Sequence, residues 1–300
     1  MVCLAVAVAF VAEVPHLTNV LRGFLMGSAD IVPGVSGGTI ALLLGIYERL
    51  VHNVRTGAGV LGAALRGQFN DAKARWEEIE WGFLLALLAG ILIAVVTLAR
   101  VLGNLLDDHP QAMAGLFFGL IAASIVIAWQ RVGQWNRPLA AAAVVAAIAA
   151  FILLGLRSGE VGDPPTMAFL AAGAVAIMAM ILPGISGSFI LLMLGMYEAV
   201  LAAVNDREFS TILVFAAGAV LGLAAFSTIL DRLLRHHHDK TMAVLIGVMI
   251  GSLRVLWPWP DGTDSAALGR PQDWIGPLLL ALAGAVAVAA IGRYAVTTSD

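Results

Sequence analysis

The sequence predicts an all-α integral membrane protein, built as an inverted-topology repeat with six transmembrane helices and two re-entrant helical hairpins. Three observations predict this class: a very apolar composition, long uncharged runs, and a motif that occurs twice. Of the 300 residues, 60% are hydrophobic and only 12% are charged, whereas about 25% of the residues in a soluble domain are charged. The mean hydropathy is +0.93. The net charge of −3 gives no basic surface for nucleic acid.

Uncharged runs predict where the chain crosses the membrane. An α-helix needs about 20 residues to cross the hydrocarbon core. Tryptophans lie near the ends of the runs, as in the aromatic belts of membrane proteins at the level of the lipid headgroups. The predicted spans cover residues 82–99, 110–130, 138–156, 209–230, 241–253 and 274–292.

A sixteen-residue segment occurs twice in the chain. Residues 33–48 read PGVSGGTIALLLGIYE and residues 183–198 read PGISGSFILLMLGMYE, with ten identities and no gap. Further on, GLIAAS at 119–124 matches GVMIGS at 247–252. The chain is therefore a duplication. The predicted units are an apolar lead-in (1–15), repeat 1 (16–156) with a cytoplasmic insertion (52–80), and repeat 2 (157–300).

Each copy of the motif opens with a break in apolar sequence. Pro33-Gly34 and Pro183-Gly184 interrupt a helix because proline lacks an N–H and clashes with the preceding turn. About fifteen residues follow Pro183 before Glu198, and a helix of that length is shorter than the ~30 Å hydrocarbon core. We therefore expect re-entrant hairpins over 16–50 and 164–200. Such backbone is tolerated at membrane depth where it is buried in protein or lines a wet cavity.

The distribution of basic residues sets the orientation. Three spans per repeat place the second copy upside down relative to the first. The 17 lysines and arginines then divide into twelve on one side and five on the other. Cytoplasmic loops carry the excess of basic residues, so the side with twelve is the cytoplasm, and the 52–80 insertion lies there.

The duplicated motifs carry the residues that suit a ligand. Small residues let backbone approach a ligand, hydroxyls donate hydrogen bonds, and N–H groups at a helix start favour an anion. Two such segments facing each other at mid-membrane form the anion site typical of inverted-repeat transporters. The alternative is that small residues only allow close helix packing, which we favour for the pairs Gly115/Gly119, Gly218/Gly222 and Gly247/Gly251. The predicted substrate-binding residues of the motifs are Ser36, Gly37, Gly38, Thr39, Ser186, Gly187 and Ser188.

Four ionisable residues accompany the motifs. Asp30 lies in apolar sequence, and an acid at membrane depth is a functional candidate. It either carries a coupling proton and contacts substrate, or caps backbone N–H groups at the break. Arg22 suits a phosphate because a guanidinium binds phosphate through two parallel hydrogen bonds. Glu48 and Glu198 end the two motif copies and act either as gates or as interfacial anchors.

Enzyme chemistry is disfavoured. Both motifs spell G-x-S-G, as in intramembrane serine proteases, but a serine nucleophile needs a general base within reach and none of the six histidines lies in a predicted span. Catalysis also gives no reason for a serine in two inverted copies. No buried histidine or acidic cluster suits a phosphatase, and the His236–His238 run reads as a solvated loop. We predict no metal and no cofactor.

The first motif resembles a known signature. The run from Arg22 through Asp30 and Ser36-Gly-Gly-Thr39 to Arg49 is similar to the bacterial polyprenyl-phosphate (undecaprenyl phosphate) translocases, formerly a domain of unknown function. The likeness covers about residues 21–293 and includes the second motif. It implies a multi-pass inner-membrane protein that returns undecaprenyl phosphate from the outer to the cytoplasmic leaflet, which recycles the lipid carrier of cell-envelope glycan synthesis. Its partners would be that lipid, membrane lipids and a coupling proton or ion.

The residues alone leave a second function open. Hydroxyls and N–H groups at mid-membrane suit any small anion as well as a phosphate headgroup. A channel or carrier for an inorganic anion is therefore the alternative to a lipid translocase.

Overall fold

The computed structural model describes residues 15–32, 34–156, 162, 164–259, 268–270 and 273–297. Across these residues the chain is helical and contains no β-strand. Three helices are long and apolar enough to cross a membrane: α6 (Trp81–Asp108), α7 (Pro110–Gln130) and α12 (Phe209–His236). The protein is therefore a multi-pass α-helical membrane protein. Of the predicted lead-in (1–15), residues 1–14 lie outside the described residues, and Pro15 is the first residue of the helix α2.

Ten further helices complete the described fold. They are α2 (Pro15–Asp30), α3 (Gly37–Leu43), α4 (Tyr47–Leu65), α5 (Phe69–Glu78), α8 (Arg137–Leu153), α9 (Thr166–Ile181), α10 (Gly187–Met193), α11 (Tyr197–Asn205), α13 (His238–Ser252) and α14 (Ile275–Thr297). Each of the six predicted spans coincides with one helix: α6, α7, α8, α12, α13 and α14 in chain order.

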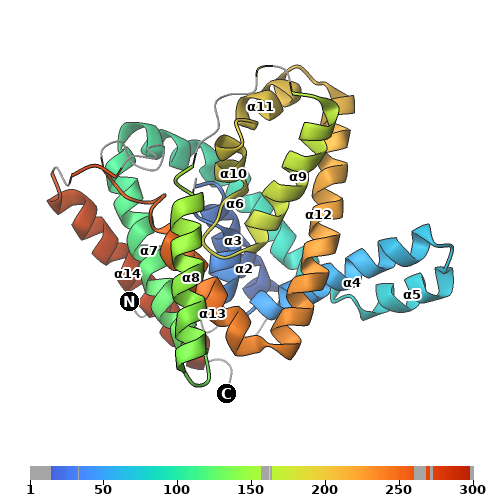
Figure 1. Ribbon diagram of the computed structural model, residues 1–300, viewed down its shortest axis with the longest axis horizontal. Coiled ribbons are helices and arrows are strands. Elements are labelled where there is room, and N and C mark those ends of the chain that lie inside the picture. The colour runs from blue at the N-terminus through green and yellow to red at the C-terminus, as the bar shows by residue number, and fades with distance from the viewer. Residues whose placement is uncertain are drawn as a thin grey trace.

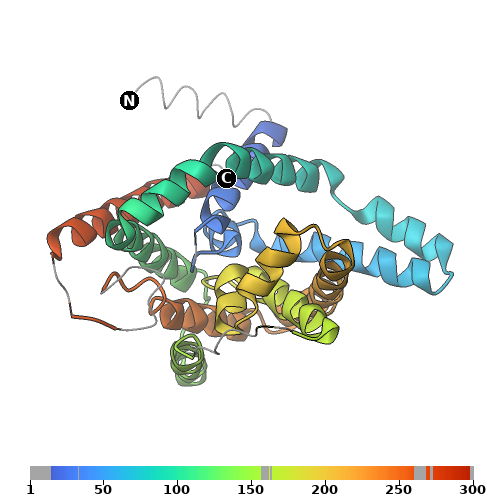
Figure 2. The same cartoon turned by 90° about the horizontal axis from the view of Figure 1, so that it is seen from above.

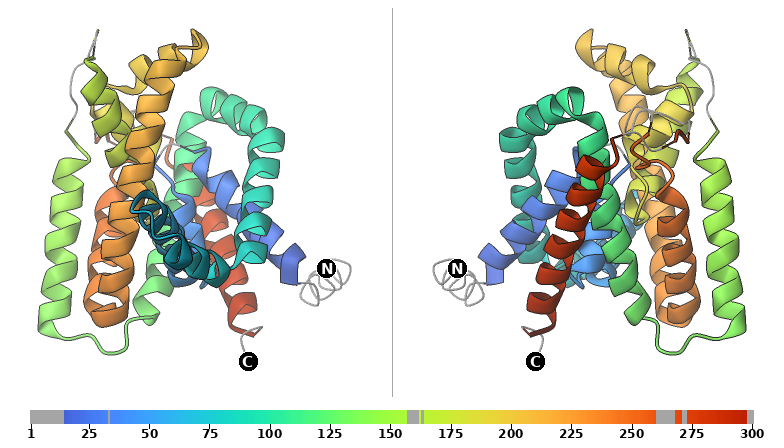
Figure 3. Two further views of the ribbon diagram at one scale, coloured as in Figure 1. Left: turned by 90° about the vertical axis from the view of Figure 1, so that its right-hand side faces the viewer. Right: turned by 90° about the vertical axis from the view of Figure 1, so that its left-hand side faces the viewer.

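The long helices pack in four pairs. Helix α2 packs on α6, and α9 packs on α12 (Figure 1). Helix α7 packs on α14, and α8 packs on α13, so these two pairs each join a helix of the first half to one of the second (Figure 3). The short helix α3 packs against α2, and the short helix α10 packs against α9.

Glycines set the closeness of these pairs, which confirms the packing interpretation of the three glycine pairs. In α7, Gly115 and Gly119 face the backbone of Pro277 and Ala281 in α14. In α12, Gly218 and Gly222 face α9, and in α13, Gly247 and Gly251 face α8. A Cβ at any of these six positions would meet a backbone carbonyl of the neighbouring helix.

We expect Gly119→Ala to destabilise the protein and Gly103→Ala not to. A Cβ at Gly119 would overlap the Ala281 carbonyl, whereas one at Gly103 in α6 meets nothing within 4 Å. Both changes gain about 1 kcal/mol of helix propensity, but overpacking costs about 1–3 kcal/mol. Thermal unfolding in detergent measures both. Equal unfolding temperatures for the two variants would show that the α7–α14 crossing is not set by this glycine.

The segment predicted as an insertion is a helical hairpin. Helix α4 continues through residues 52–65 without a break, so it crosses the predicted hairpin boundary at residue 50, and α5 runs back after a turn at Gly67 (φ +72°). This α4–α5 hairpin projects sideways from the rest of the protein (Figure 2). Its base is fixed to the start of α6: Arg49 Nε lies 3.0 Å from a Glu80 carboxylate oxygen, and Asn53 exchanges two hydrogen bonds with Glu80.

The Arg49–Glu80 contact predicts a pH effect. The guanidinium of Arg49 holds the pKa of Glu80 below its usual range. The pair therefore stabilises the fold above the usual glutamate pKa, and this contribution is lost as the pH falls below about 4.3. We expect Glu80→Gln to lower stability at neutral pH and to make the unfolding temperature less sensitive to acid. The same decrease of unfolding temperature with falling pH in the wild type and in Glu80→Gln would contradict this.

Candidate functional site

The two predicted breaks fold in the same way. The Val35 N–H donates to the Val32 carbonyl at 3.2 Å, and the Ile185 N–H donates to the Leu182 carbonyl at 3.4 Å, so each closes a four-residue turn. Gly34 and Gly184 stand third in these turns with φ of +83° and +87°, a conformation that glycine adopts without a steric cost. Pro33 lies outside the described residues.

A second pair of bends follows. Helices α3 and α10 each have seven residues, and Gly45 (φ +73°) and Gly195 (φ +68°) turn the chain after them. The expectation of one helical piece of about fifteen residues after Pro183 was wrong, since α10 and α11 meet at an angle of 113°. The left-handed glycine at the helix end explains the bend.

Side chains of the first motif hydrogen-bond to the backbone of the second break. Ser36 Oγ donates to the Met180 carbonyl at 2.8 Å, and the Tyr47 hydroxyl donates to the Ile181 carbonyl at 3.0 Å. Thr39 Oγ1 accepts the Gly184 N–H at 2.7 Å. Ser36 and Thr39 are fully buried. The two broken segments therefore meet inside the protein.

Asp30 caps the start of α3. Its Oδ1 accepts the Gly37 N–H at 2.6 Å, and Ser36 Oγ accepts the Gly38 N–H at 3.0 Å. A Cβ at Gly37 would lie 2.5 Å from Asp30 Oδ2, so glycine is required for this approach. The capping role considered for Asp30 is confirmed, and a coupling role stays a prediction.

The corresponding residues of the second motif bond locally. Ser186 Oγ lies 2.8 Å from Ser188 Oγ, and Gly187 packs against Ala176 and Met180 of α9. Ser186 is buried and Ser188 half-buried. The two hydroxyls of this motif therefore bond to each other, whereas those of Ser36 and Thr39 bond to backbone of the second break.

The other predicted residues lie farther out. Arg22 donates to Asn19 Oδ1 at 3.0 Å. Glu48 lies 3.0 Å from His238 Nε2 at the start of α13. Glu198 is exposed at the start of α11. The two glutamates of the repeated Tyr-Glu pair thus have different surroundings.

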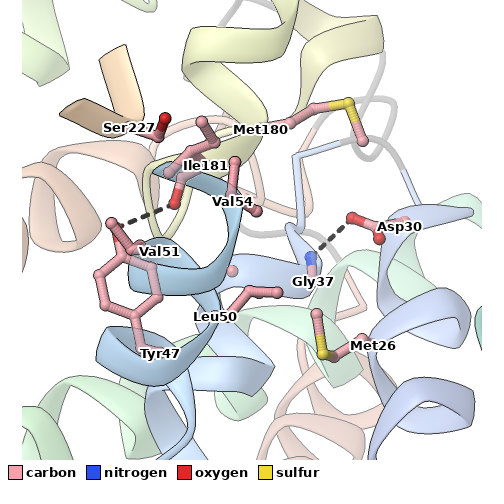
Figure 4. A pocket seen from close by; sticks show the side chains of 11 residues that line it. Met26, Asp30, Gly37, Tyr47, Leu50, Val51, Val54, Met180, Ile181 and Ser227 are labelled. Carbon is pink, nitrogen blue, oxygen red and sulfur yellow. Dashed lines mark hydrogen bonds between the residues drawn. The ribbon is translucent and has the colours of Figure 1, made fainter. Parts of the chain in front are cut away.

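A cavity of about 130 Å³ lies beside the first break. Of the predicted substrate-binding residues, Asp30, Gly37 and Gly38 line it (Figure 4), whereas the lining does not include Arg22, Ser36, Thr39, Ser186, Gly187 or Ser188. We call it the central cavity. It is also lined by Met26, Tyr47, Leu50, Val51, Val54, Met180, Ile181 and Ser227.

Ser227 is one of the lining residues that sequence reasoning missed. It is fully buried in α12, and Figure 4 shows it with Tyr47 across the cavity from Asp30. The match of 119–124 with 247–252 corresponds to an offset of 128 residues, and at this offset the residue equivalent to Ser227 in the first repeat is Ala99. The duplication therefore did not mark Ser227 as a candidate. The usable signal was a hydroxyl inside an apolar run, because polar side chains in spans face the interior of the protein.

Comparison with known proteins identifies the family of the chain. Residues 26–270 match the family model described as undecaprenyl phosphate translocase-like. The chain is 36% identical to a Vibrio cholerae protein named polyprenyl-phosphate transporter, over 93% of this chain and 97% of that protein. It is 31% identical to a Staphylococcus aureus protein of the same name, over 92% and 95%. No solved structure matches the chain. The chain belongs to the undecaprenyl phosphate translocase-like family.

Proposed function

We propose that this protein moves undecaprenyl phosphate from the outer to the cytoplasmic leaflet of the bacterial inner membrane, without changing it chemically. The names of the two relatives support the lipid. The observation that best supports a path for the phosphate headgroup is the contact between the two Pro-Gly breaks. There Ser36 and Thr39 bind the backbone at Met180 and Gly184 beside the central cavity.

The path rests on an inverted architecture, which is part of the proposal. Two re-entrant hairpins (16–50 and 164–200) and six spans would place the breaks face to face, with repeats over 16–156 and 157–300. The helix pairing supports this arrangement: α2–α6 corresponds to α9–α12, and α7–α14 corresponds to α13–α8. The four positive-φ glycines at matching positions support it as well.

The phosphate would bind by exchanging partners with the two breaks. The Ser36 hydroxyl is engaged with Met180 and that of Thr39 with Gly184, whereas Ser186 and Ser188 bond only to each other in the described chain. When the breaks separate, all four hydroxyls turn to the headgroup, together with Gly37, Gly38 and Gly187. Arg22 captures the phosphate, Asp30 carries a coupling proton, and Glu48 and Glu198 gate the two sides.

Proteoliposomes test the proposal. Purified protein should move a labelled polyprenyl phosphate between leaflets and leave it chemically unchanged, and empty liposomes should not. The competing function, a channel or carrier for a small anion, predicts uptake of inorganic phosphate or an anion conductance. Anion movement without lipid movement would reject the translocase.

A further inference from the structure

We propose a second phosphate-binding site on the predicted cytoplasmic side, between the α4–α5 hairpin and α12. A cavity of about 550 Å³ lies there. Its charged lining consists of His52, Arg55, Asp71, Arg75, Glu78 and Arg235. We call this cavity the basic pocket. It is separate from the central cavity and shares no lining residue with it.

A buried acid holds two of the arginines in place. Asp231 of α12 is 4% exposed; its carboxylate lies 2.9 Å from Arg55 Nη1 and 3.1 Å from Arg235 Nε. Two guanidiniums share this one carboxylate, so this cluster keeps a positive charge after pairing, and Asp71 and Glu78 supply the two carboxylates of the pocket lining itself. Each guanidinium has five N–H donors, and 40% of the Arg55 and 52% of the Arg235 side chain is exposed. Both therefore keep donors for an anion in the pocket.

Arg75 of α5 contributes a third cation to the lining. Its guanidinium lies over Gly59 of α4, where a Cβ would be 2.7 Å from Nη1. Within the described part of the chain Arg75 makes no ion pair. Three guanidiniums from α4, α5 and α12 thus converge on one cavity, and planar guanidinium groups are well matched to phosphate oxygens.

The aromatic residues near the pocket support a position at the level of the lipid headgroups. Helix α5 leads directly into the span of α6, and Trp76 and Trp81 are in ring contact there, with centroids 4.2 Å apart; such aromatic pairs mark the membrane interface. At the end of the hairpin, Leu65 is 80% and Phe69 is 72% exposed, which fits contact with lipid. The ligand is accordingly a phosphate group, either on a membrane lipid or free in the cytoplasm.

The basic pocket follows the central cavity along the same helix interface. On α12, Ser227 lines the central cavity, Asp231 follows one turn later, and Arg235 lines the basic pocket one further turn on. On α4, Val51 lines the central cavity and Arg55 the basic pocket. A phosphate that leaves the central cavity toward the cytoplasm therefore reaches the basic pocket next.

Binding of geranyl phosphate to the purified full-length protein tests the site by equilibrium dialysis. This probe is a water-soluble prenyl monophosphate. Arg75→Gln should weaken one class of sites about ten- to a hundredfold, the effect of losing a charged hydrogen bond. Arg137→Gln, an exposed arginine on the same predicted side, should leave binding unchanged. Ser186→Ala should affect only the other class, so failure of this site and of the proposed path are distinguishable.

A charge-neutral pair of variants gives a second test. Gly59→Ala should displace the Arg75 guanidinium and weaken the same class severalfold. Gly57→Ala on the same helix should not, since its nearest neighbour would be Ile79 Cδ1 at 4.0 Å. Competition by inorganic phosphate would identify free phosphate as a ligand, and its failure would identify the lipid headgroup; either supports a phosphate site. Wild-type binding by both Arg75→Gln and Gly59→Ala, or equal binding of geraniol, would overturn the proposal.

Discussion

Replacing Ser36 by alanine is expected to reduce lipid transport about ten- to a hundredfold and to destabilise the protein. The Ser36 hydroxyl donates to the Met180 carbonyl and accepts the Gly38 N–H, and it is fully buried. Alanine would leave both backbone groups without this partner, at a cost of about 1–3 kcal/mol for each buried group. The change therefore loosens the contact between the two breaks and removes one proposed phosphate ligand.

Ser186→Ala is the matched control for this effect. Within the described structure, the Ser186→Ala variant loses only the hydrogen bond between Ser186 and Ser188. We therefore expect near-normal thermal unfolding together with impaired transport. The unfolding temperature and the initial rate in proteoliposomes separate the two contributions. An unchanged unfolding temperature for Ser36→Ala would show that its bonds to Met180 and Gly38 do not hold the breaks together.

Asp30→Asn is expected to keep the fold and to abolish the pH response of transport. An asparagine oxygen can still accept the Gly37 N–H that Asp30 accepts at 2.6 Å, but the charge is lost. A carboxylate 4 Å from a phosphate charge repels it by about 4 kcal/mol at an effective dielectric constant of 20. The headgroup should therefore occupy the central cavity with Asp30 protonated, and wild-type transport should rise as the pH falls.

Transport rates over a series of pH values around neutrality measure this difference, because an equilibrium linked to proton binding shifts with pH. The wild type should be faster at the lower pH values, and Asp30→Asn should not respond. Asp30→Ala serves as the structural control, because it removes the cap of α3 as well and should lower the unfolding temperature. A pH response preserved in Asp30→Asn would limit Asp30 to capping.

Much of the fold follows from local sequence. Uncharged runs marked all six of the segments that form α6, α7, α8, α12, α13 and α14, because length and apolarity are properties of each segment alone. The glycines of α7, α12 and α13 were assigned to packing from their spacing of four, which puts both members of a pair on one helix face. The breaks at Gly34 and Gly184 followed from the Pro-Gly pairs.

The remaining features depend on contacts between distant residues. The bend at Gly195 requires a left-handed glycine, and the sequence does not distinguish that glycine from one inside a helix. Helix α4 continues through a stretch that reads as polar because Arg55 and His52 pair with Asp231, which lies far along the chain. The partners of Ser36 and Thr39 are backbone groups, which no side-chain pattern identifies.

A leaflet-resolved transport assay of the paired serine variant tests the central claim most directly. Wild-type protein and Ser36→Ala/Ser186→Ala, reconstituted at equal amounts of folded protein, are compared for movement of labelled undecaprenyl phosphate between leaflets. We expect the wild type to move the lipid and the double variant to be slower by at least about a hundredfold, since two charged hydrogen bonds are lost. Equal rates would contradict a headgroup path between the two Pro-Gly breaks.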